Sequence, residues 1–169
     1  MIMANVELVL GDDISTDVIY PGRFMATVLP SETPQFAFAD NVEFNTKLTS
    51  GKIPPGSVIV AGKNFGCGSS REQAVSALRG YDLTIVAKSI ARIFLQNAIN
   101  LGLRVVIAPT IVAAEGEELE ITDTAVIQKN TGQQFPLEPL PKARQAIIDA
   151  GGLIAYTRRR VMEASVSIG

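Results

Sequence analysis

The chain has 169 residues, 47% of them hydrophobic and 19% charged, and its formal net charge is −2. This composition is typical of a folded domain and excludes an intrinsically disordered chain, and the slight negative charge argues against a nucleic-acid-binding surface. The sequence holds one cysteine and no histidine, so it excludes an internal disulfide, and one thiolate cannot hold an iron–sulfur cluster. Without histidine, acid–base chemistry would depend on Ser, Asp, Glu, Lys, Tyr or Cys side chains.

The length fits one domain over residues 1–169. No apolar run approaches the roughly 20 residues that span a membrane, and residues 1–10 lack the basic start of a secretory signal. We therefore expect a cytoplasmic protein that has neither a membrane nor a nucleic acid as a partner.

The first predicted element is a strand over residues 6–10, which ends at Gly11. Asp12 and Asp13 follow, and Asp17 lies close behind them. A cation-binding loop needs more oxygen ligands at regular spacing, so turn and capping roles are expected for Asp12 and Asp13.

Residues 30–57 are rich in Pro, Ser, Thr, Asn and Gly and show weak periodicity. A long loop in a compact domain is usually functional or mobile, so this segment is expected to be a flap. Phe36, Phe38 and Phe44 are the side chains expected to hold it against the body.

The chain is organised around residues 62–73, which read GKNFGCGSSREQ. An apolar run over residues 58–61 precedes this stretch and a helical pattern over residues 72–78 follows it, so the sequence predicts a strand, a glycine-rich turn and a helix. Ser69 or Ser70 is expected to cap the helix, and Glu72 has the spacing of a capping box with Ser69.

Backbone N–H groups, two hydroxyl groups and the Arg71 guanidinium would converge at this turn. Such a group of donors suits a small anion, and the planar fork of arginine suits a carboxylate. A structural turn that binds nothing is the alternative on spacing alone. The stretch lacks the GK[ST] of a phosphate-binding loop, and it lacks the GxGxxG pattern of dinucleotide-binding folds.

The remaining elements alternate between strands and helices. We expect strands over residues 83–87 and 105–108, a helix from Ser89 through Leu101 that stops at Gly102, hairpin segments at 119–122 and 125–128 with a turn at 130–132, and a final helix over 142–150. The run Arg158–Arg159–Arg160 is expected to be a solvated terminal face. On pattern alone the fold class is mixed α/β.

GKNFGCGSSREQ resembles the serine–arginine signature of the 3-isopropylmalate dehydratase small-subunit family, which matches the swivelling C-terminal domain of aconitase. Residues 11–25 (GDDISTDVIYPGRFM), 87–103 (AKSIARIFLQNAINLGL) and 151–160 (GGLIAYTRRR) are also similar. The resemblance implies the swivelling β/β/α fold of the aconitase C-terminal domain.

The resemblance also implies a hydro-lyase that isomerises 2-isopropylmalate to 3-isopropylmalate by dehydration and rehydration, in leucine biosynthesis. Its active form would need a large catalytic subunit, in a heterodimer or heterotetramer, and that subunit would carry the 4Fe–4S cluster. No cofactor or metal ligand is expected in this chain. By the same resemblance Ser69 is the catalytic base, and Ser70 and Arg71 hold a carboxylate of the dicarboxylate substrate. Asp17 is implied to point into the active-site cleft, where it would help to hold Arg71 or the substrate.

Substrate choice is expected to depend on residues 23–27. In related two-chain enzymes this loop reaches the part of the substrate that differs, and Ala26 matches the position that is arginine in enzymes for a third carboxylate. An alanine there favours an alkyl group, unless Arg23 swings inward and supplies the charge. Gln73 stands where a histidine is common in the family. A glutamine at this position also occurs in relatives such as homoaconitase. The alternatives are therefore homoaconitase, a dehydratase of methylated malates of the dimethylmalate or citramalate type, and a non-catalytic binding or assembly subunit.

Overall fold

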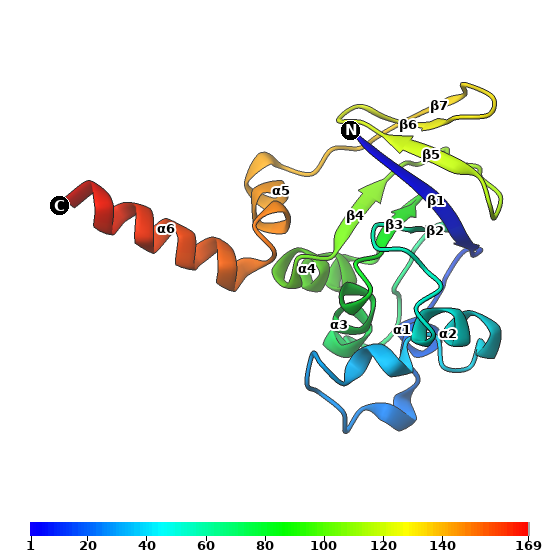
Figure 1. The fold of residues 1–169 in the computed structure, drawn as a ribbon, viewed down its shortest axis with the longest axis horizontal. Helices are drawn as coiled ribbons and strands as arrows, with labels where there is room; N and C mark the ends of the chain where they lie inside the picture. The colour runs from blue at the N-terminus through cyan, green and yellow to red at the C-terminus, as the bar shows by residue number, and fades with distance from the viewer. Residues whose placement is uncertain (169) are drawn as a thin grey trace.

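A seven-stranded mixed sheet runs through the computed structural model, which describes residues 1–168 (Figure 1). Its strands are β1 (Ile2–Val9), β2 (Val58–Ala61), β3 (Thr84–Ala87), β4 (Arg104–Ile107), β5 (Glu118–Ile121), β6 (Ala125–Gln128) and β7 (Gln134–Pro136). The order across the sheet is β4-β3-β2-β1-β5-β6-β7. Strands β1 to β4 are parallel, and β5 to β7 continue antiparallel from β1.

The sheet curls so that its two ends approach each other. The backbone N–H of Glu138, just after β7, donates to the carbonyl of Ile107 at the end of β4 over 2.9 Å. The hairpin segments and the turn over residues 130–132 are confirmed, because β5, β6 and β7 form consecutive antiparallel pairs.

Helices and short 3-10 helices lie between the strands and after β7. They are α1 (Thr16–Ile19), η1 (Gly22–Phe24), η2 (Thr33–Phe36), α2 (Val42–Thr49), α3 (Glu72–Gly80), α4 (Arg92–Leu101), α5 (Lys142–Asp149) and α6 (Leu153–Ile168). Helices α3 and α4 pack side by side below β2 to β4 (Figure 1). The mixed α/β class is confirmed, and α4 ends at Gly102 in the left-handed conformation as expected.

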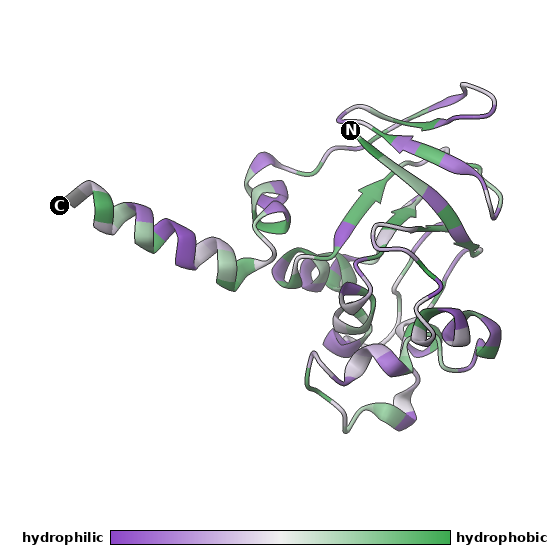
Figure 2. Cartoon of the chain, viewed as in Figure 1, coloured by the Kyte–Doolittle hydropathy of each residue, from purple (hydrophilic) through white to green (hydrophobic). Residues whose placement is uncertain are grey.

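The central strands β2 and β3 are buried along their whole length, because both faces of this part of the sheet are covered. Ile59 and Ile85 point into a core shared with α3 and α4, whereas Val58 and Val86 point into a second core shared with the hairpin strands. This explains why the two strands read as continuous apolar runs, and Figure 2 shows hydrophobic residues along them.

The expectation of a long loop at residues 30–57 was wrong, since η2 and α2 form there. The side-chain amide of Asn45 donates to the carbonyls of Gln35 and Ala37 over 3.0 and 2.9 Å, which fixes α2 against η2. The expected aromatic anchoring is confirmed, because Phe38 and Phe44 are buried and their rings form an edge-to-face pair.

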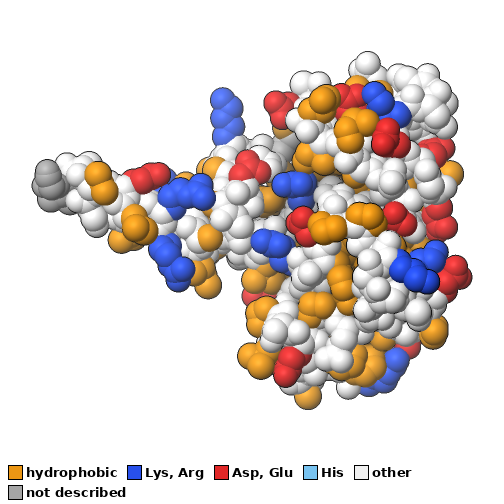
Figure 3. All heavy atoms as spheres, in the orientation of Figure 1, with side chains coloured by type: hydrophobic (Ala, Val, Ile, Leu, Met, Phe, Trp, Pro, Cys, Tyr) orange, Lys and Arg blue, Asp and Glu red, His pale blue; other side chains and the backbone are white. Residues whose placement is uncertain are grey.

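The expectation that the helix at residues 142–150 is the last one was also wrong. Gly151 and Gly152 both take positive φ values, which turns the chain, and α6 begins directly after them. Figure 3 shows α6 protruding from the body with apolar and basic side chains on its surface. The run Arg158–Arg159–Arg160 is exposed on this helix, as expected. No helix in the described part of the chain is long and apolar enough to cross a membrane.

Candidate functional site

The glycine-rich loop between β2 and α3 is shaped by residues in the left-handed conformation. Asn64, Gly66 and Gly68 have φ values of 60°, 81° and 89°. At Gly66 an added Cβ would collide with the ring of Phe94 on α4, so only glycine lets the loop lie against that helix. The backbone N–H of Gly66 donates to the carbonyl of Ile14 over 2.7 Å, which joins the loop to the segment after β1.

Polar side chains from two neighbouring turns hold the start of this loop. Asp12 accepts from the backbone N–H of Lys63 over 2.7 Å, and Asp13 accepts from the side-chain amide of Asn64 over 2.9 Å. Both contacts span 51 positions in the chain, so the two aspartates join distant segments rather than make the local turn and capping bonds that were expected. Ser89 accepts from the backbone N–H of Asn64 over 2.8 Å. It does not cap α4 as expected, because that helix begins only at Arg92, with Ala91 at its N-cap position.

Ser69 and Ser70 are exposed at the end of the loop. The expected serine cap on α3 was wrong: Arg71 occupies the N-cap position, with no capping side chain. The backbone explains the difference, since the carbonyl of Ser69 accepts from the hydroxyl of Thr16 over 2.7 Å and α3 begins only at Glu72. Within residues 1–168, neither serine hydroxyl has a hydrogen-bond partner that would occupy it.

The guanidinium of Arg71 is held by hydrogen bonds to residues in and just after α1. Its Nη1 donates to Oδ1 of Asp17 over 2.7 Å and to the carbonyl of Tyr20 over 3.1 Å. The same Asp17 oxygen accepts from the backbone N–H of Gly22 over 2.8 Å. The hydrogen bond from Arg71, followed by the one from Gly22, lowers the pKa of Asp17. The guanidinium is therefore fixed in direction by a carboxylate that stays ionised at neutral pH.

A cavity of about 340 Å³ opens beside these residues. It is lined by Thr16, Asn64, Gly66, Cys67, Gly68, Ser69, Ser70, Arg71, Ala91, Arg92, Ile93, Phe94 and Asn97. The structure thus brings Ser69, Ser70 and Arg71 together at one hollow. No acidic side chain of the described residues lines it, so a small anion fits it electrostatically.

Arg23 and Ala26 lie outside the lining of this cavity. The guanidinium of Arg23 instead binds Asp40 with distances of 2.6 and 3.2 Å and stacks 4.5 Å from the ring centroid of Phe24. Ala26 is exposed. The carbonyl of Met25 accepts from the side-chain amide of Gln73 over 3.2 Å, so Gln73 ties the 22–27 loop to α3.

Sequence reasoning missed Arg92 and Asn64 as cavity residues, and it missed the contact of Gln73. One signal was available for Arg92. It follows β3, the strand next to β2, and the carboxyl ends of neighbouring parallel strands meet at the same edge of a sheet. Placing the helix start at Ser89 concealed this, because it put Arg92 inside the helix rather than at its first residue.

The donor groups of this chain do not fit a 4Fe–4S cluster. The sequence has a single thiol, Cys67, and no imidazole. Among the residues that the structure describes, no group of three or more His, Cys, Asp or Glu side chains is placed to hold a metal ion.

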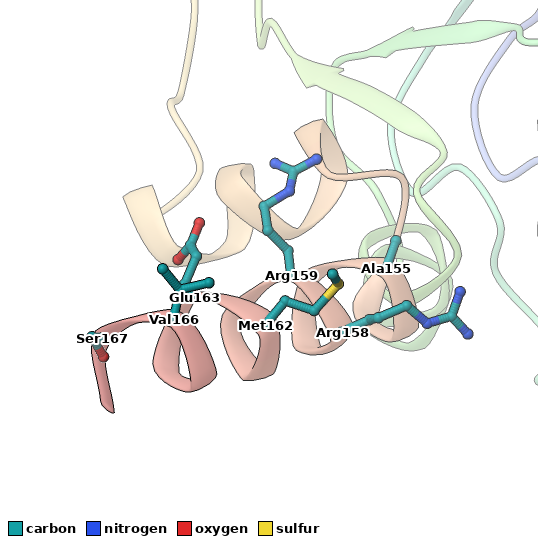
Figure 4. A pocket seen from close by; sticks show the side chains of 7 residues that line it. All are labelled: Ala155, Arg158, Arg159, Met162, Glu163, Val166 and Ser167. Atoms are coloured by element: carbon teal, nitrogen blue, oxygen red, sulfur yellow. The ribbon is translucent and has the colours of Figure 1, made fainter. Parts of the chain in front are cut away.

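A second hollow, of about 620 Å³, runs along α6. Figure 4 shows that its labelled side chains all come from this one helix and that Arg158 and Arg159 point in different directions. A ligand site is usually formed by polar groups that converge from several elements. The hollow beside Ser69 has that property and the one along α6 does not, so the α6 hollow is not the candidate site.

The sequence is similar to one family profile and to several curated proteins. The sequence profile of the aconitase C-terminal domain matches residues 13–109. The 3-isopropylmalate dehydratase small subunit of Methanosarcina mazei is 42% identical over 164 residues, covering 90% of this chain and 94% of the relative. The isopropylmalate/citramalate isomerase small subunit of Methanocaldococcus jannaschii is 38% identical over 159 residues, covering 91% and 92%.

A solved structure from the same group of proteins has a similar fold. The crystal structure of a 3-isopropylmalate dehydratase, LeuD, from Methanocaldococcus jannaschii superposes with a TM-score of 0.87 at 37% identity. It covers 98% of this chain and 98% of its own. The curled sheet and the helices packed on it are therefore shared along the whole length of that structure, which confirms the expected fold.

Proposed function

The chain belongs to the aconitase C-terminal domain family, and we propose that it is the small subunit of a 3-isopropylmalate dehydratase. In this role it forms a hydro-lyase with a large subunit and isomerises 2-isopropylmalate to 3-isopropylmalate in leucine biosynthesis. The observation that carries the proposal is the arrangement at the cavity: two exposed serine hydroxyls beside a guanidinium that Asp17 holds in place.

Ser69 is the proposed base, which removes the proton from the carbon next to a substrate carboxylate. A serine hydroxyl loses its proton only where the resulting negative charge is stabilised. Two features support this role. The side chain is exposed at the cavity, and it lies just before the N-terminus of α3, where the helix dipole and Arg71 both favour a negative charge.

Ser70 and Arg71 are the proposed binding groups for one carboxylate. The hydrogen bonds of Arg71 to Asp17 and Tyr20 use Nη1, and no other N–H of its guanidinium has a hydrogen-bond partner among residues 1–168. A planar fork held from behind binds both oxygens of a carboxylate without first having to be ordered. Asp17 acts in this proposal by orienting Arg71.

The 4Fe–4S cluster of the proposed enzyme is assigned to the large subunit, because the one thiol of this chain cannot hold it. The proposed compartment is the cytoplasm, where thiolates stay reduced. We propose no cluster ligand and no metal ligand in this chain.

The proposed substrate carries an alkyl group rather than a third carboxylate. Ala26 offers no charge at the matched position, and Arg23 is already bound to Asp40. An unpaired carboxylate buried against Ala26 would cost several kcal/mol, whereas each buried methylene group gains about 0.8 kcal/mol. The name of the Methanocaldococcus jannaschii relative supports citramalate as a second alkyl substrate.

The test is to purify the chain alone and together with a co-expressed large subunit, and to assay both against isopropylmalate, citramalate and homoaconitate. We expect activity only in the pair, with a preference for the alkyl substrates. A pair that assembles with an intact cluster and turns over none of them would contradict the enzyme proposal and would favour a binding or assembly subunit.

A further inference from the structure

The cavity beside Ser69 is lined by a second arginine that the proposed roles do not use. We propose that Arg92 binds the second carboxylate of the substrate, opposite the carboxylate held by Arg71. This inference rests on the proposed function for the identity of the substrate. It concerns a residue on a different helix, α4, and it can be tested by binding alone.

The first argument is the charge of the cavity. Arg71 and Arg92 both line it, and no carboxylate of the described residues does. The cavity also faces the starts of two helices, α3 at Glu72 and α4 at Arg92, and neither helix has a side-chain cap. Each of these starts adds partial positive charge. A doubly negative ligand matches this arrangement better than a singly negative one.

The second argument is that Arg92 lacks a structural role. Arg71 and Arg23 are bound to Asp17 and Asp40, whereas none of the ion pairs among residues 1–168 includes Arg92. Its side chain is exposed. Asp17 already offsets the charge of Arg71, whereas no carboxylate among residues 1–168 pairs with Arg92, so its charge is available to an anion in the cavity. A cation at a cavity without an ion-pair partner is typical of a group that binds an anionic ligand.

The third argument is position. The loop after β2 and the turn before α4 are joined by backbone hydrogen bonds, from Phe65 to Ser89 over 3.1 Å and from Ala91 to Phe65 over 2.9 Å. Ala91 immediately precedes Arg92, so these bonds fix the start of α4 relative to the loop that carries Ser69. Arg92 and Arg71 are therefore presented to the same ligand from two rigidly connected elements.

The experiment uses the assembled pair and three variants: Arg92→Gln, Arg92→Lys and, as the matched control, Arg144→Gln. Arg144 is an exposed arginine on α5 that lines none of the cavities described above. Dissociation constants are measured by calorimetry for a competitive alkylmalate inhibitor and for its two monoamides, in each of which one carboxylate is replaced by a neutral amide. KM, kcat and subunit assembly are measured in parallel.

We expect Arg92→Gln to weaken the dicarboxylate roughly tenfold to a hundredfold, which is the usual loss for a hydrogen bond to a charged group. The effect should fall on KM more than on kcat. For one monoamide the effect of Arg92→Gln should disappear, because its partner charge is already missing. Arg92→Lys should recover part of the affinity, and Arg144→Gln should leave it unchanged.

Equal affinity of Arg92→Gln and the wild type for the dicarboxylate would overturn the inference. So would an equal loss for the dicarboxylate and both monoamides, because that pattern indicates a change of shape or of assembly. The calorimetric readout separates the two proposals. A pair that binds the dicarboxylate through Arg92 but does not isomerise isopropylmalate would contradict the proposed reaction and leave the role of Arg92 standing.

Discussion

Nη1 of Arg71 lies 2.7 Å from Oδ1 of Asp17, although 54 positions separate the two residues in the chain. The side chain of Arg71 is 16% exposed and that of Asp17 is 64% exposed. Most of the Arg71 side chain is therefore covered by the protein, while the Asp17 side chain that orients it is mostly exposed to solvent.

The Asp17 carboxylate should contribute a pH-dependent part of the stability. Arg71 lowers the pKa of Asp17 in the folded state, so this contribution is fully present above the pKa of the unfolded chain. It is lost as the pH falls through the lowered pKa of the folded protein. We expect Asp17→Asn to be less stable than the wild type at pH 7, and the difference to disappear in strongly acidic solution.

Urea unfolding of both proteins in steps from pH 7 to below the ordinary aspartate range measures this difference. Asp123→Asn, an exposed aspartate outside the ion pairs of the described residues, is the control. A stability difference that is the same at every pH would show that the charge of Asp17 does not matter.

Arg71→Lys should not behave as a conservative change. Lysine keeps the positive charge but loses the planar fork, which donates to Asp17 and is proposed to bind a substrate carboxylate. We expect kcat/KM of the assembled pair to fall roughly tenfold or more. An unchanged kcat/KM, measured with isopropylmalate, would mean that Arg71 only supports the fold.

Ser69→Ala should abolish most turnover without unfolding the chain. The contact of Ser69 with Thr16 uses the backbone carbonyl, which alanine retains. We expect kcat to fall by about 10²- to 10⁴-fold, the usual contribution of a general base. Circular dichroism and co-purification with the large subunit should be unchanged. Ser31→Ala, at an exposed serine outside the cavity, is the control. Turnover near the wild-type level would remove Ser69 from the role of base.

Gly66→Ala should lower the stability of the protein at the contact between the glycine-rich loop and α4. Gly66 has a φ of 81°, and its neighbour is the ring of Phe94. The left-handed conformation costs an alanine about 1 kcal/mol and the overpacking about 1–3 kcal/mol more. Thermal melting measures the effect. Gly11→Ala is the control, because an added Cβ there meets no atom within 4 Å. Equal melting temperatures for both variants would contradict the close packing of the loop on α4.

Ala26→Arg should shift substrate preference toward a third carboxylate. Ala26 lies on the loop that Gln73 ties to α3, and its alkyl side chain supplies no charge. We expect the wild-type pair to prefer isopropylmalate over homoaconitate in kcat/KM, and the variant to narrow or reverse that ratio. Val28→Arg, at another exposed position of the same segment, tests whether any added charge is enough. A wild-type preference for homoaconitate would overturn the specificity proposal.

The local structure around the site can be predicted from the sequence. The apolar run at residues 58–61, the glycines of the loop and the helical pattern after it predict the strand, turn and helix observed as β2, the loop and α3. Gly102 likewise predicts the end of α4. These features follow from backbone preferences within a few residues, and a single sequence reveals them.

The tertiary structure alone decided which distant groups meet. The parallel order of β2, β3 and β4 places Arg92 beside Ser69 and Arg71, and helix α1, which follows β1, places Asp17 against Arg71. The expected serine cap also fails in the folded chain, where the carbonyl of Ser69 accepts from Thr16 and Arg71 occupies the N-cap position. Hydrogen bonds and packing between segments far apart in the chain leave no local sequence pattern. Only the tertiary structure therefore shows that Arg71 and Arg92 line the same cavity.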